Sequence, residues 1–446
     1  MTHLSKHIFL SILLSFVFVM TFSAEQTDEE KRKDIIRYGL ENEISELVVK
    51  LQSENDTSFT AELIELFNKT KSPLLRETIL ALFTFQKNAS LKDFSLEVLT
   101  NTFDYKRTTV IAVLEYTAEM KFPEASPLIR IILESEQTDY RSKAIQTLGK
   151  LGNPEDALLL LEFMESDFSG DEKQRLITRQ DVMAAISELK AVEAWDTLIA
   201  IAEDTEENIM IRASAAKAIG SLEKIEAVPV LALLYEDSDP ILRTAAVQAL
   251  SNFNTTEAIE IILESFKDSY YKVRLEGIAA AEKLVLLQAL PYILYRAKSD
   301  PVENVKLRAF EALGILKSAE ADEWLLSLFV DPKTVDKIRL KTASVLIKNN
   351  FNFIFPDLEK VIMQTLKDDK KTVLRYELGK LVAATESSLT SGIASAYLSH
   401  KDTLTRSLGL DMYSKNRYSD VKNAIENIAV DEKQGALQRR AKKLLD

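Results

Sequence analysis

One register, repeated eleven times, constrains this chain more than any other feature of its sequence. Each copy contains a basic residue that is followed, four and seven places later, by side chains without charge. The basic residues are Arg76, Arg107, Arg141, Arg179, Arg212, Arg243, Arg274, Lys306, Arg339, Arg375 and Arg406. Because steps of four and three residues return to one face of an α-helix, every copy predicts a helix with a buried stripe.

The stripe is apolar or small in every copy. Seven places after the basic residue stand Phe83, Leu114, Leu148, Ile186, Ile219, Leu250, Ala281, Leu313, Leu346, Val382 and Tyr413. Four places after it stand Leu80, Ile111, Ile145, Met183, Ala216, Val247, Ile278, Phe310, Ala343, Gly379 and Leu410. We expect both sets to be buried between neighbouring helices. The side chain of Ser251, next to Leu250, should point about 100° away from the stripe, so we expect Ser251→Asp to be nearly silent.

A second apolar helix is expected in each interval between these copies. The expected second helices cover residues 90–101, 124–135, 154–166, 191–203, 224–236, 255–267, 287–298, 319–330, 354–367, 387–399 and 418–429. Two short helices that recur every 31 to 38 residues are typical of an α-solenoid. The predicted fold class is therefore all-α, an α-solenoid (superhelix) of about eleven helix pairs with N- and C-terminal caps.

The two ends of the chain depart from the register. Residues 25–70 are expected to form an N-terminal helical cap that begins with a frayed charged stretch at 27–33. Residues 71–446 form the repeat array, including a C-terminal capping helix. Within the array, the polar run 165–174 is interpreted as a loop insertion, and Pro356 is placed in the first turn of a second helix.

Residues 1–24 have the layout of a secretory signal peptide. Lys6 precedes an apolar run at 8–22, and the small residues Ser23 and Ala24 follow it. The run is shorter than the roughly 20 residues that a membrane-spanning helix needs. We therefore expect an exported protein, periplasmic or extracellular, with cleavage near Ser23. The alternative is a chain anchored by an uncleaved N-terminal helix.

Composition restricts the chemistry that the chain can perform. It has no cysteine, and two of its three histidines lie in the leader, which leaves His400. Thiolate sites and multi-histidine zinc sites are therefore excluded, and we expect no metal and no other cofactor. The net charge of −13 predicts no binding of nucleic acid and no direct membrane binding after signal cleavage.

At these repeated residues the chain resembles the HEAT-repeat family, particularly the short bacterial form named after phycobilisome lyases. The resemblance covers roughly residues 71–446. It implies HEAT-like helix pairs joined by a ladder, in which acidic residues near the interhelix turns pair with the basic residues. Acidic residues stand six places before the basic residue at Glu206, Asp237, Asp268, Asp300 and Asp369. We therefore expect an incomplete ladder, strongest in its middle, with paired arginines that hold the structure together.

Few other side chains are candidates for a site. The carboxylate pairs Glu29–Glu30, Glu206–Glu207 and Asp368–Asp369 are interpreted as solvated surface, and acid–base catalysis is the alternative. Five tyrosines could form one binding cluster, although aromatic residues at helical spacing are more often core; they are Tyr235, Tyr270, Tyr271, Tyr292 and Tyr295. Trp195 and Trp324 stand in unlike registers and suggest no common site.

Two classes of function remain. The first is an exported, non-catalytic scaffold that holds a protein or peptide partner on the solenoid surface. The alternative is an accessory subunit or a repeat-based enzyme of the bilin-lyase-like type, which the resemblance suggests. We expect no enzyme, with no catalytic, cofactor-binding or metal-binding residues, and the sequence does not specify which residues bind the partner.

Overall fold

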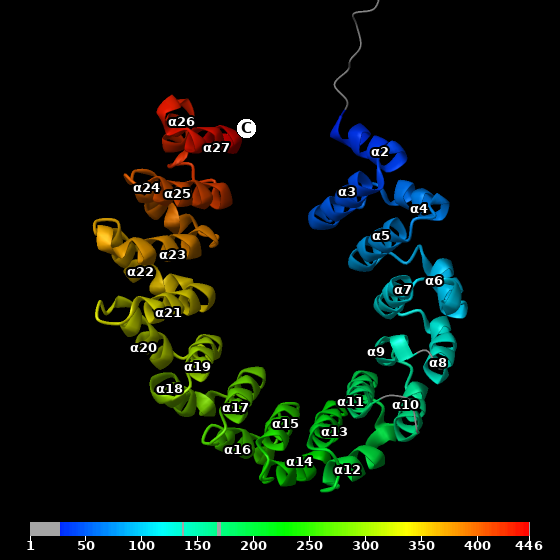
Figure 1. Ribbon diagram of the computed structural model, residues 1–446. Helices are drawn as coiled ribbons and strands as arrows, with labels where there is room; N and C mark the ends of the chain where they lie inside the picture. The colour runs from blue at the N-terminus through cyan, green and yellow to red at the C-terminus, as the bar shows by residue number, and fades with distance from the viewer. Residues whose placement is uncertain (1–26, 136–137, 167–170, 446) are drawn as a thin grey trace, which may run out of the picture. The chain divides into compact units, whose positions relative to one another are not determined.

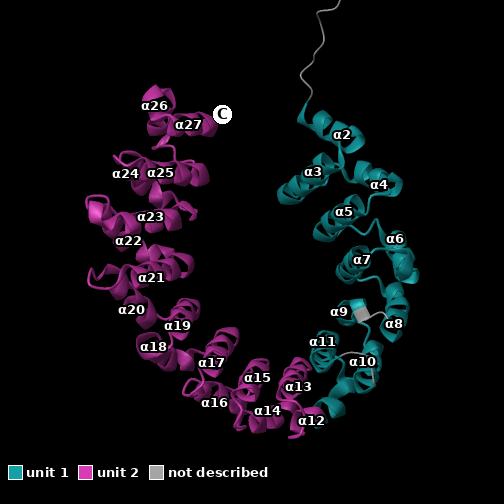
Figure 2. Cartoon of the chain, in the orientation of Figure 1, with its two compact units in different colours: residues 1–200 teal, residues 201–446 magenta. Residues whose placement is uncertain are grey.

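The computed structural model describes residues 27–135, 138–166 and 171–445, and every regular element in these ranges is a helix (Figure 1). The prediction of an all-α α-solenoid is thereby confirmed. The contacts divide the chain into two compact units, residues 1–200 and 201–446, with the border inside one helix (Figure 2).

Unit 1 begins with the three helices of the predicted N-terminal cap. They are α2 (Asp28–Tyr38), α3 (Glu41–Glu54) and α4 (Thr60–Lys69). The expectation of a frayed start was wrong. The side chain of Thr27 accepts a hydrogen bond from the Glu30 backbone N–H, and the Glu30 carboxylate accepts one from the Thr27 N–H. This capping box satisfies two backbone donors and starts the helix within the charged stretch.

Four helix pairs follow the cap in unit 1. The first helices are α5 (Pro73–Phe85), α7 (Arg107–Met120), α9 (Arg141–Leu151) and α11 (Glu172–Leu189). The second helices are α6 (Lys92–Thr100), α8 (Ser126–Glu134), α10 (Glu155–Glu165) and α12 (Trp195–Glu203), which crosses the border between the units. Successive first helices pack on one another from α3 to α11, so they form one layer of the unit.

Seven helix pairs and a capping helix make up unit 2. The first helices are α13 (Ile209–Ser221), α15 (Pro240–Leu250), α17 (Tyr271–Lys283), α19 (Glu303–Leu316), α21 (Asp336–Asn349), α23 (Thr372–Ala383) and α25 (Thr403–Asn416). The second helices are α14 (Ala227–Tyr235), α16 (Thr256–Ser265), α18 (Leu290–Ser299), α20 (Ala319–Val330), α22 (Phe351–Thr365), α24 (Ser391–Leu398) and α26 (Lys422–Val430). Helix α27 (Ala436–Leu445) packs on α25 and α26 as the C-terminal cap.

Short 3-10 turns complete the secondary structure, several of them leading into second helices. They are Thr102–Asp104, Pro123–Ala125, Thr138–Tyr140, Val192–Ala194, Leu287–Ala289, Asp369–Lys371, Ser388–Thr390 and Glu432–Gln434.

The predicted stripe forms the core of both units. All eleven residues seven places after the basic residue are buried, and so are all of those four places after it except the half-buried Ile111. The prediction for Ser251 was wrong. Its side chain is only 8% exposed, and its hydroxyl donates to the Gln248 carbonyl oxygen at 2.6 Å. Because the next first helix packs beside it, a residue off the stripe is covered as well.

A left-handed residue ends most first helices at a fixed place, eleven positions after the basic residue. These turn residues have φ between 48° and 79°, and they are Lys87, Gly152, Lys190, Glu223, Val285, Lys317 and Arg417. Such a conformation favours glycine, yet six of the seven are not glycine.

Two further expectations required correction. Residues 171–174 of the polar run are not loop, because Asp171 caps α11 and Glu172 begins it; residues 167–170 lie outside the described part. Pro356 lies inside α22, which starts at Phe351 rather than at 354. A proline there removes one backbone hydrogen bond of the helix.

The predicted signal peptide, residues 1–24, lies outside the described residues. Within the described ranges, no helix combines the length and the apolar character that a membrane crossing requires.

Candidate functional site

The predicted ladder exists in the first half of unit 2, where it has three rungs. Arg212 contacts Asp237 at 3.4 Å, while Arg243 and Arg274 hold the next acidic residues with two hydrogen bonds each. In the last of these, Arg274 Nε and Nη2 donate to the two Asp300 carboxylate oxygens at 2.7 and 2.8 Å.

Asp268 and Asp300, the acidic members of the last two rungs, are kept ionised by their surroundings. Burial alone would raise the pKa of Asp268 and of Asp300. Hydrogen bonds from Arg243 and Arg274 and from the Tyr270 and Val302 backbone N–H groups, together with the positive charge of the arginines, outweigh the effect of burial, so both pKa values lie below the ordinary value. The three arginines are thus fixed within the structure, as predicted, and offer no free row of anion-binding groups.

The predicted acidic residue at the C-terminal end of the ladder has another partner. Asp369 pairs with Lys401 at 2.6 Å on an exposed surface. Further along, Arg339 and Arg375 donate to the Phe329 and Thr365 carbonyl oxygens at the ends of second helices.

The carboxylate pairs do not converge on a common site. Glu29 pairs with Lys33 at 2.7 Å, Glu30 caps α2, and Asp368 accepts a hydrogen bond from the Lys370 backbone N–H. Nδ1 of His400 accepts a hydrogen bond from the Asp402 backbone N–H. In the described part of the chain, no three His, Cys, Asp or Glu side chains gather in a group that could hold a metal ion.

The five tyrosines occupy separate places rather than one cluster. Tyr270 and Tyr271 contact each other with ring centroids 5.2 Å apart, whereas Tyr292 packs on Phe266 at 5.7 Å. Tyr295 is 56% exposed, and Arg296 lies over its ring.

The remaining aromatic candidates belong to the packing. Burial raises the pKa of Tyr235 to about 12. Trp324 stacks on Phe310 with centroids 5.6 Å apart, while Trp195 begins α12. The structure therefore gives these residues structural roles.

A different set of positions forms the accessible surface of the first helices. The residues one and five places after the basic residue lie one turn apart on the same helix face, away from the second helices. We call these positions the surface row. Side chains on neighbouring first helices meet across it, as where Ser142 of α9 donates to Asp181 of α11.

In unit 2 the first of the two surface-row positions is apolar or aromatic over four successive first helices. The residue one place after the basic residue is Leu275, Leu307, Leu340 and Tyr376 in α17 to α23, and each is half-buried. The same position is Thr244 in α15 and is Ser, Thr, Gln, Glu or Ala in the remaining copies.

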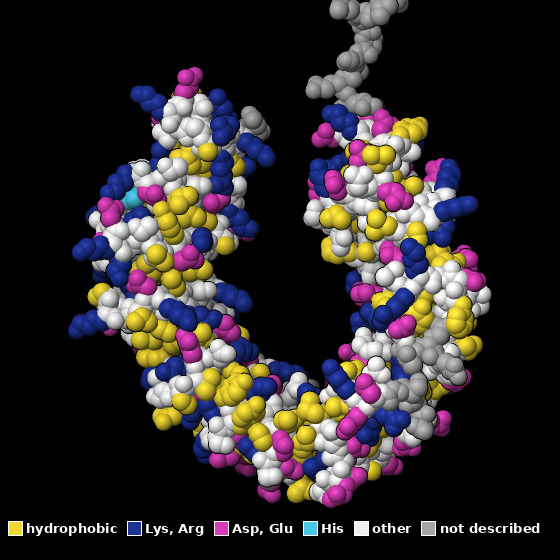
Figure 3. Space-filling model, in the orientation of Figure 1, with side chains coloured by type: hydrophobic (Ala, Val, Ile, Leu, Met, Phe, Trp, Pro, Cys, Tyr) yellow, Lys and Arg dark blue, Asp and Glu magenta, His cyan; other side chains and the backbone are white. Residues whose placement is uncertain are grey.

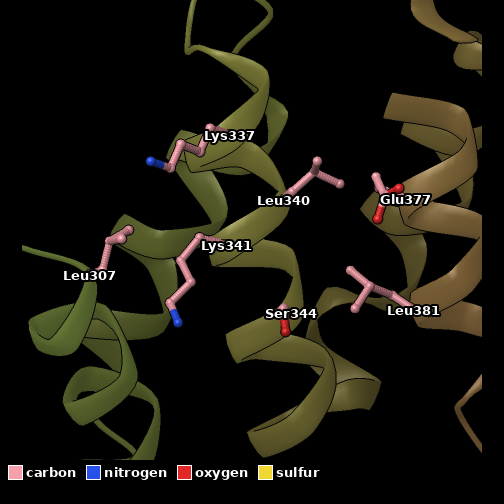
Figure 4. Close-up of a pocket in the computed structure, with 7 residues that line it drawn as sticks. All are labelled: Leu307, Lys337, Leu340, Lys341, Ser344, Glu377 and Leu381. Atoms are coloured by element: carbon pink, nitrogen blue, oxygen red, sulfur yellow. The ribbon is translucent and has the colours of Figure 1, made fainter. Parts of the chain in front are cut away.

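A hollow of about 270 Å³ opens within this apolar stretch, between α19, α21 and α23 (Figure 4). Its lining residues are Leu307, Lys337, Leu340, Lys341, Ser344, Glu377 and Leu381, and we call it the leucine hollow. Leu340 and Leu381 point into the space between α21 and α23 (Figure 4). The interval from Arg339 to Arg375 is the longest in unit 2, and it contains the longest second helix, α22.

Charged side chains rim the leucine hollow without occupying it. Lys337 pairs with Glu303 and Lys341 with Glu311, so both ammonium groups point toward α19 and away from Leu381 (Figure 4). Glu377 on the opposite wall pairs with Lys380 at 2.7 Å. The space between the two walls is therefore apolar.

A second hollow, of about 340 Å³, lies on the surface row between α13, α15 and α17. Glu276 lines it, and burial raises the pKa of this carboxyl above its ordinary value, against the influence of Lys217 and Arg308. Lys283 at the rim is hydrogen-bonded to Asn252 at 2.6 Å. This hollow is more polar than the first.

The sequence did not identify these residues as a site. The tyrosines were chosen by residue type, although the same register that predicted the core also contained the run Leu275, Leu307, Leu340. An apolar run one place after the basic residue was the available signal, because that position should otherwise face water.

Comparisons with known proteins agree with this architecture. A family model described as spirochaete HEAT repeat protein matches residues 36–444. A comparison with curated proteins finds no match.

Among solved structures, Kap95 in its complex with Nup1 is similar, with 12% identity and a TM-score of 0.50 over 92% of this chain and 66% of Kap95. The phycocyanin lyase complex of CpcE and CpcF from Nostoc sp. PCC7120 matches with 18% identity and a TM-score of 0.30, over 66% of this chain and 94% of that chain. Human deoxyhypusine hydroxylase matches with 17% identity and a TM-score of 0.27, over 60% and 96% of the two chains. Because the family model spans most of the sequence, this chain belongs to the spirochaete HEAT repeat protein family.

Proposed function

We propose that this protein is an exported, non-catalytic scaffold that holds a protein or peptide partner on the surface row of unit 2. The observation that carries the proposal is the leucine hollow, where apolar side chains on three first helices remain open to solvent. An apolar recess with a polar rim is the usual form of a protein-binding surface.

The arrangement of charges beside the surface row supports a binding role over a catalytic one. Arg308 pairs with Glu282 and Glu311, and Glu311 also pairs with Lys341. General acid–base catalysis needs groups that are free to exchange a proton with a substrate. These side chains instead neutralise one another across neighbouring helices.

Export is the second part of the proposal, and the leader sequence supports it. N-terminal sequencing of the protein isolated from its native host should give a chain that begins between Ser23 and Gln26. Recovery of a chain with an intact Met1 in the membrane fraction would show that the leader is retained and that the protein is anchored rather than released.

Site-specific photo-crosslinking tests the binding surface. A benzoylphenylalanine introduced at Lys380, which is exposed beside the leucine hollow, should give a discrete protein adduct in the native host. The same probe at Lys360, exposed on the second helix α22, is the matched control. Equal adducts from both positions, or none from Lys380, would contradict the proposed binding surface.

A further inference from the structure

We propose that the leucine hollow receives an aliphatic side chain from an extended partner segment whose acidic residues reach α27. The inference rests on the proposed scaffold function and adds the chemistry of the partner. It follows from two features of unit 2, the apolar stretch of the surface row and the charge of the helix at its end.

The apolar part of the site is suited to one aliphatic anchor. The hollow has a volume of about 270 Å³ and three leucines in its lining, and the ammonium groups of Lys337 and Lys341 are held away from it by acidic partners. A charged or strongly polar side chain would lose its water there without gaining a free partner. An aliphatic side chain would cover apolar surface that is otherwise in contact with water.

The charged part of the site is α27. This helix carries Arg439, Arg440, Lys442 and Lys443 and has no acidic residue, although the whole chain has a net charge of −13. Lysine and arginine side chains gather around this end of unit 2 (Figure 3). An acidic segment would therefore be attracted to this end of the unit and repelled by most other surfaces.

Two contacts place α27 in line with the hollow. Nη1 of Arg440 contacts the Ser407 hydroxyl at 2.7 Å, and Nη2 pairs with Asp411. Ser407 and Asp411 are the surface-row positions of α25, equivalent to Leu340 and Ser344 of α21. Lys443 follows Arg440 by three residues and so lies on the same helix face. One surface thus continues from the hollow to the basic cap.

The spacing of the helices sets the length of the partner segment. Helix α25 packs between α27 and α23, which forms one wall of the hollow. Two helix spacings of roughly 10 Å each place α27 about 20 Å from α23. An extended chain covers about 3.3 Å for each residue. The acidic residues should therefore stand about six or seven positions from the aliphatic anchor.

Selection from a phage-displayed library of random dodecapeptides on the purified full chain tests this inference. Selected peptides should combine an aliphatic residue with Asp or Glu about six or seven positions away. Their affinity, measured by fluorescence anisotropy of labelled synthetic copies, should fall by about ten-fold or more when Ser344→Leu fills the hollow. The double change Lys442→Glu and Lys443→Glu should weaken binding several-fold and remove much of its dependence on salt.

Matched controls use the same chemical changes on second helices. Ser327→Leu in α20, and Lys360→Glu with Lys367→Glu at α22, should leave binding unchanged because these exposed residues lie away from the surface row. Circular dichroism of each variant checks that it remains folded.

Each other outcome has a definite meaning. Selected peptides that are basic or lack acidic residues would overturn the proposed chemistry, while peptides unaffected by Ser344→Leu would place the anchor elsewhere. Both results would leave the scaffold function standing. If no peptide is enriched and the crosslinking probe at Lys380 also gives no adduct, the scaffold function itself fails.

Discussion

At the scale of single residues, the packing of unit 2 depends on how closely two helix backbones approach. A Cβ added at Gly220 of α13 would lie 2.5 Å from the Cβ of Ala249 and 2.7 Å from its Cα, on the neighbouring first helix α15. Such separations are too short for any side chain. Gly220 stands in the last turn of α13, where its lack of a side chain permits this close contact.

We therefore predict that Gly220→Ala destabilises unit 2, by about 1 to 3 kcal/mol, although the same change at an open helix position stabilises a protein. Urea unfolding followed by circular dichroism measures the effect. Gly392→Ala in α24 is the control, because a Cβ there would approach only the end of the Glu359 side chain at 3.3 Å. Equal stability of the wild type and Gly220→Ala would mean that α13 and α15 can move apart without cost.

At the scale of helices, the buried rungs of the ladder hold neighbouring repeats in register. Arg274 is 4% exposed and Asp300 is 1% exposed, and Arg296 also contacts Asp300 at 3.3 Å. Removing one partner of a buried ion pair leaves a charge without compensation, which costs more than the pair itself contributes.

Asp300→Ala should therefore destabilise the packing of α17 on α19 by about 3 kcal/mol. The double change Arg274→Met with Asp300→Leu should recover much of this loss, because no unpaired charge remains. Asp369→Ala removes an exposed pair of similar length, with Lys401, and should cost far less stability than Asp300→Ala. Differential scanning calorimetry of the wild type and the three variants compares their stabilities. Similar losses of stability in Asp300→Ala and Asp369→Ala would show that burial does not determine the cost of breaking the pair.

The sequence predicted burial correctly at positions where packing alone decides which residue types are accepted. A position such as Leu313, fully enclosed by two helix layers, accepts only apolar side chains, so the register predicted its burial correctly. Half-buried positions such as Leu340 accept many residue types, and their role depends on how far apart two helices lie. The repeat pattern did not specify that distance, although the interval from Arg339 to Arg375 is the longest in unit 2. The prediction for Ser251 failed for a related reason, because a neighbouring helix covers its side chain.

At the scale of the whole molecule, the main contacts of each described repeat are with the repeats beside it, so damage should remain local. Leu250→Asp would place a carboxylate at a site with no exposed surface. The charged group must then take up a proton or open the repeat, at a cost of several kcal/mol.

Hydrogen exchange measured by mass spectrometry should show faster exchange in α13 to α17 of Leu250→Asp, with α23 to α27 protected as in the wild type. Gln248→Asp adds the same charge two residues away, at an exposed position, and should change little. Loss of protection throughout both units would show instead that the chain unfolds as one cooperative body.

The left-handed turn residues give this protein a simple route to greater heat resistance. Val285 adopts a φ of 52°, which is unfavourable for a β-branched residue, and its side chain is 59% exposed. Val285→Gly would remove backbone strain of about 1 kcal/mol or more. The greater conformational freedom of glycine in the unfolded chain would offset part of this gain. The same place recurs in other repeats, at turn residues that do not line the leucine hollow. The melting temperature of the array could thus be adjusted one turn at a time while partner binding is preserved.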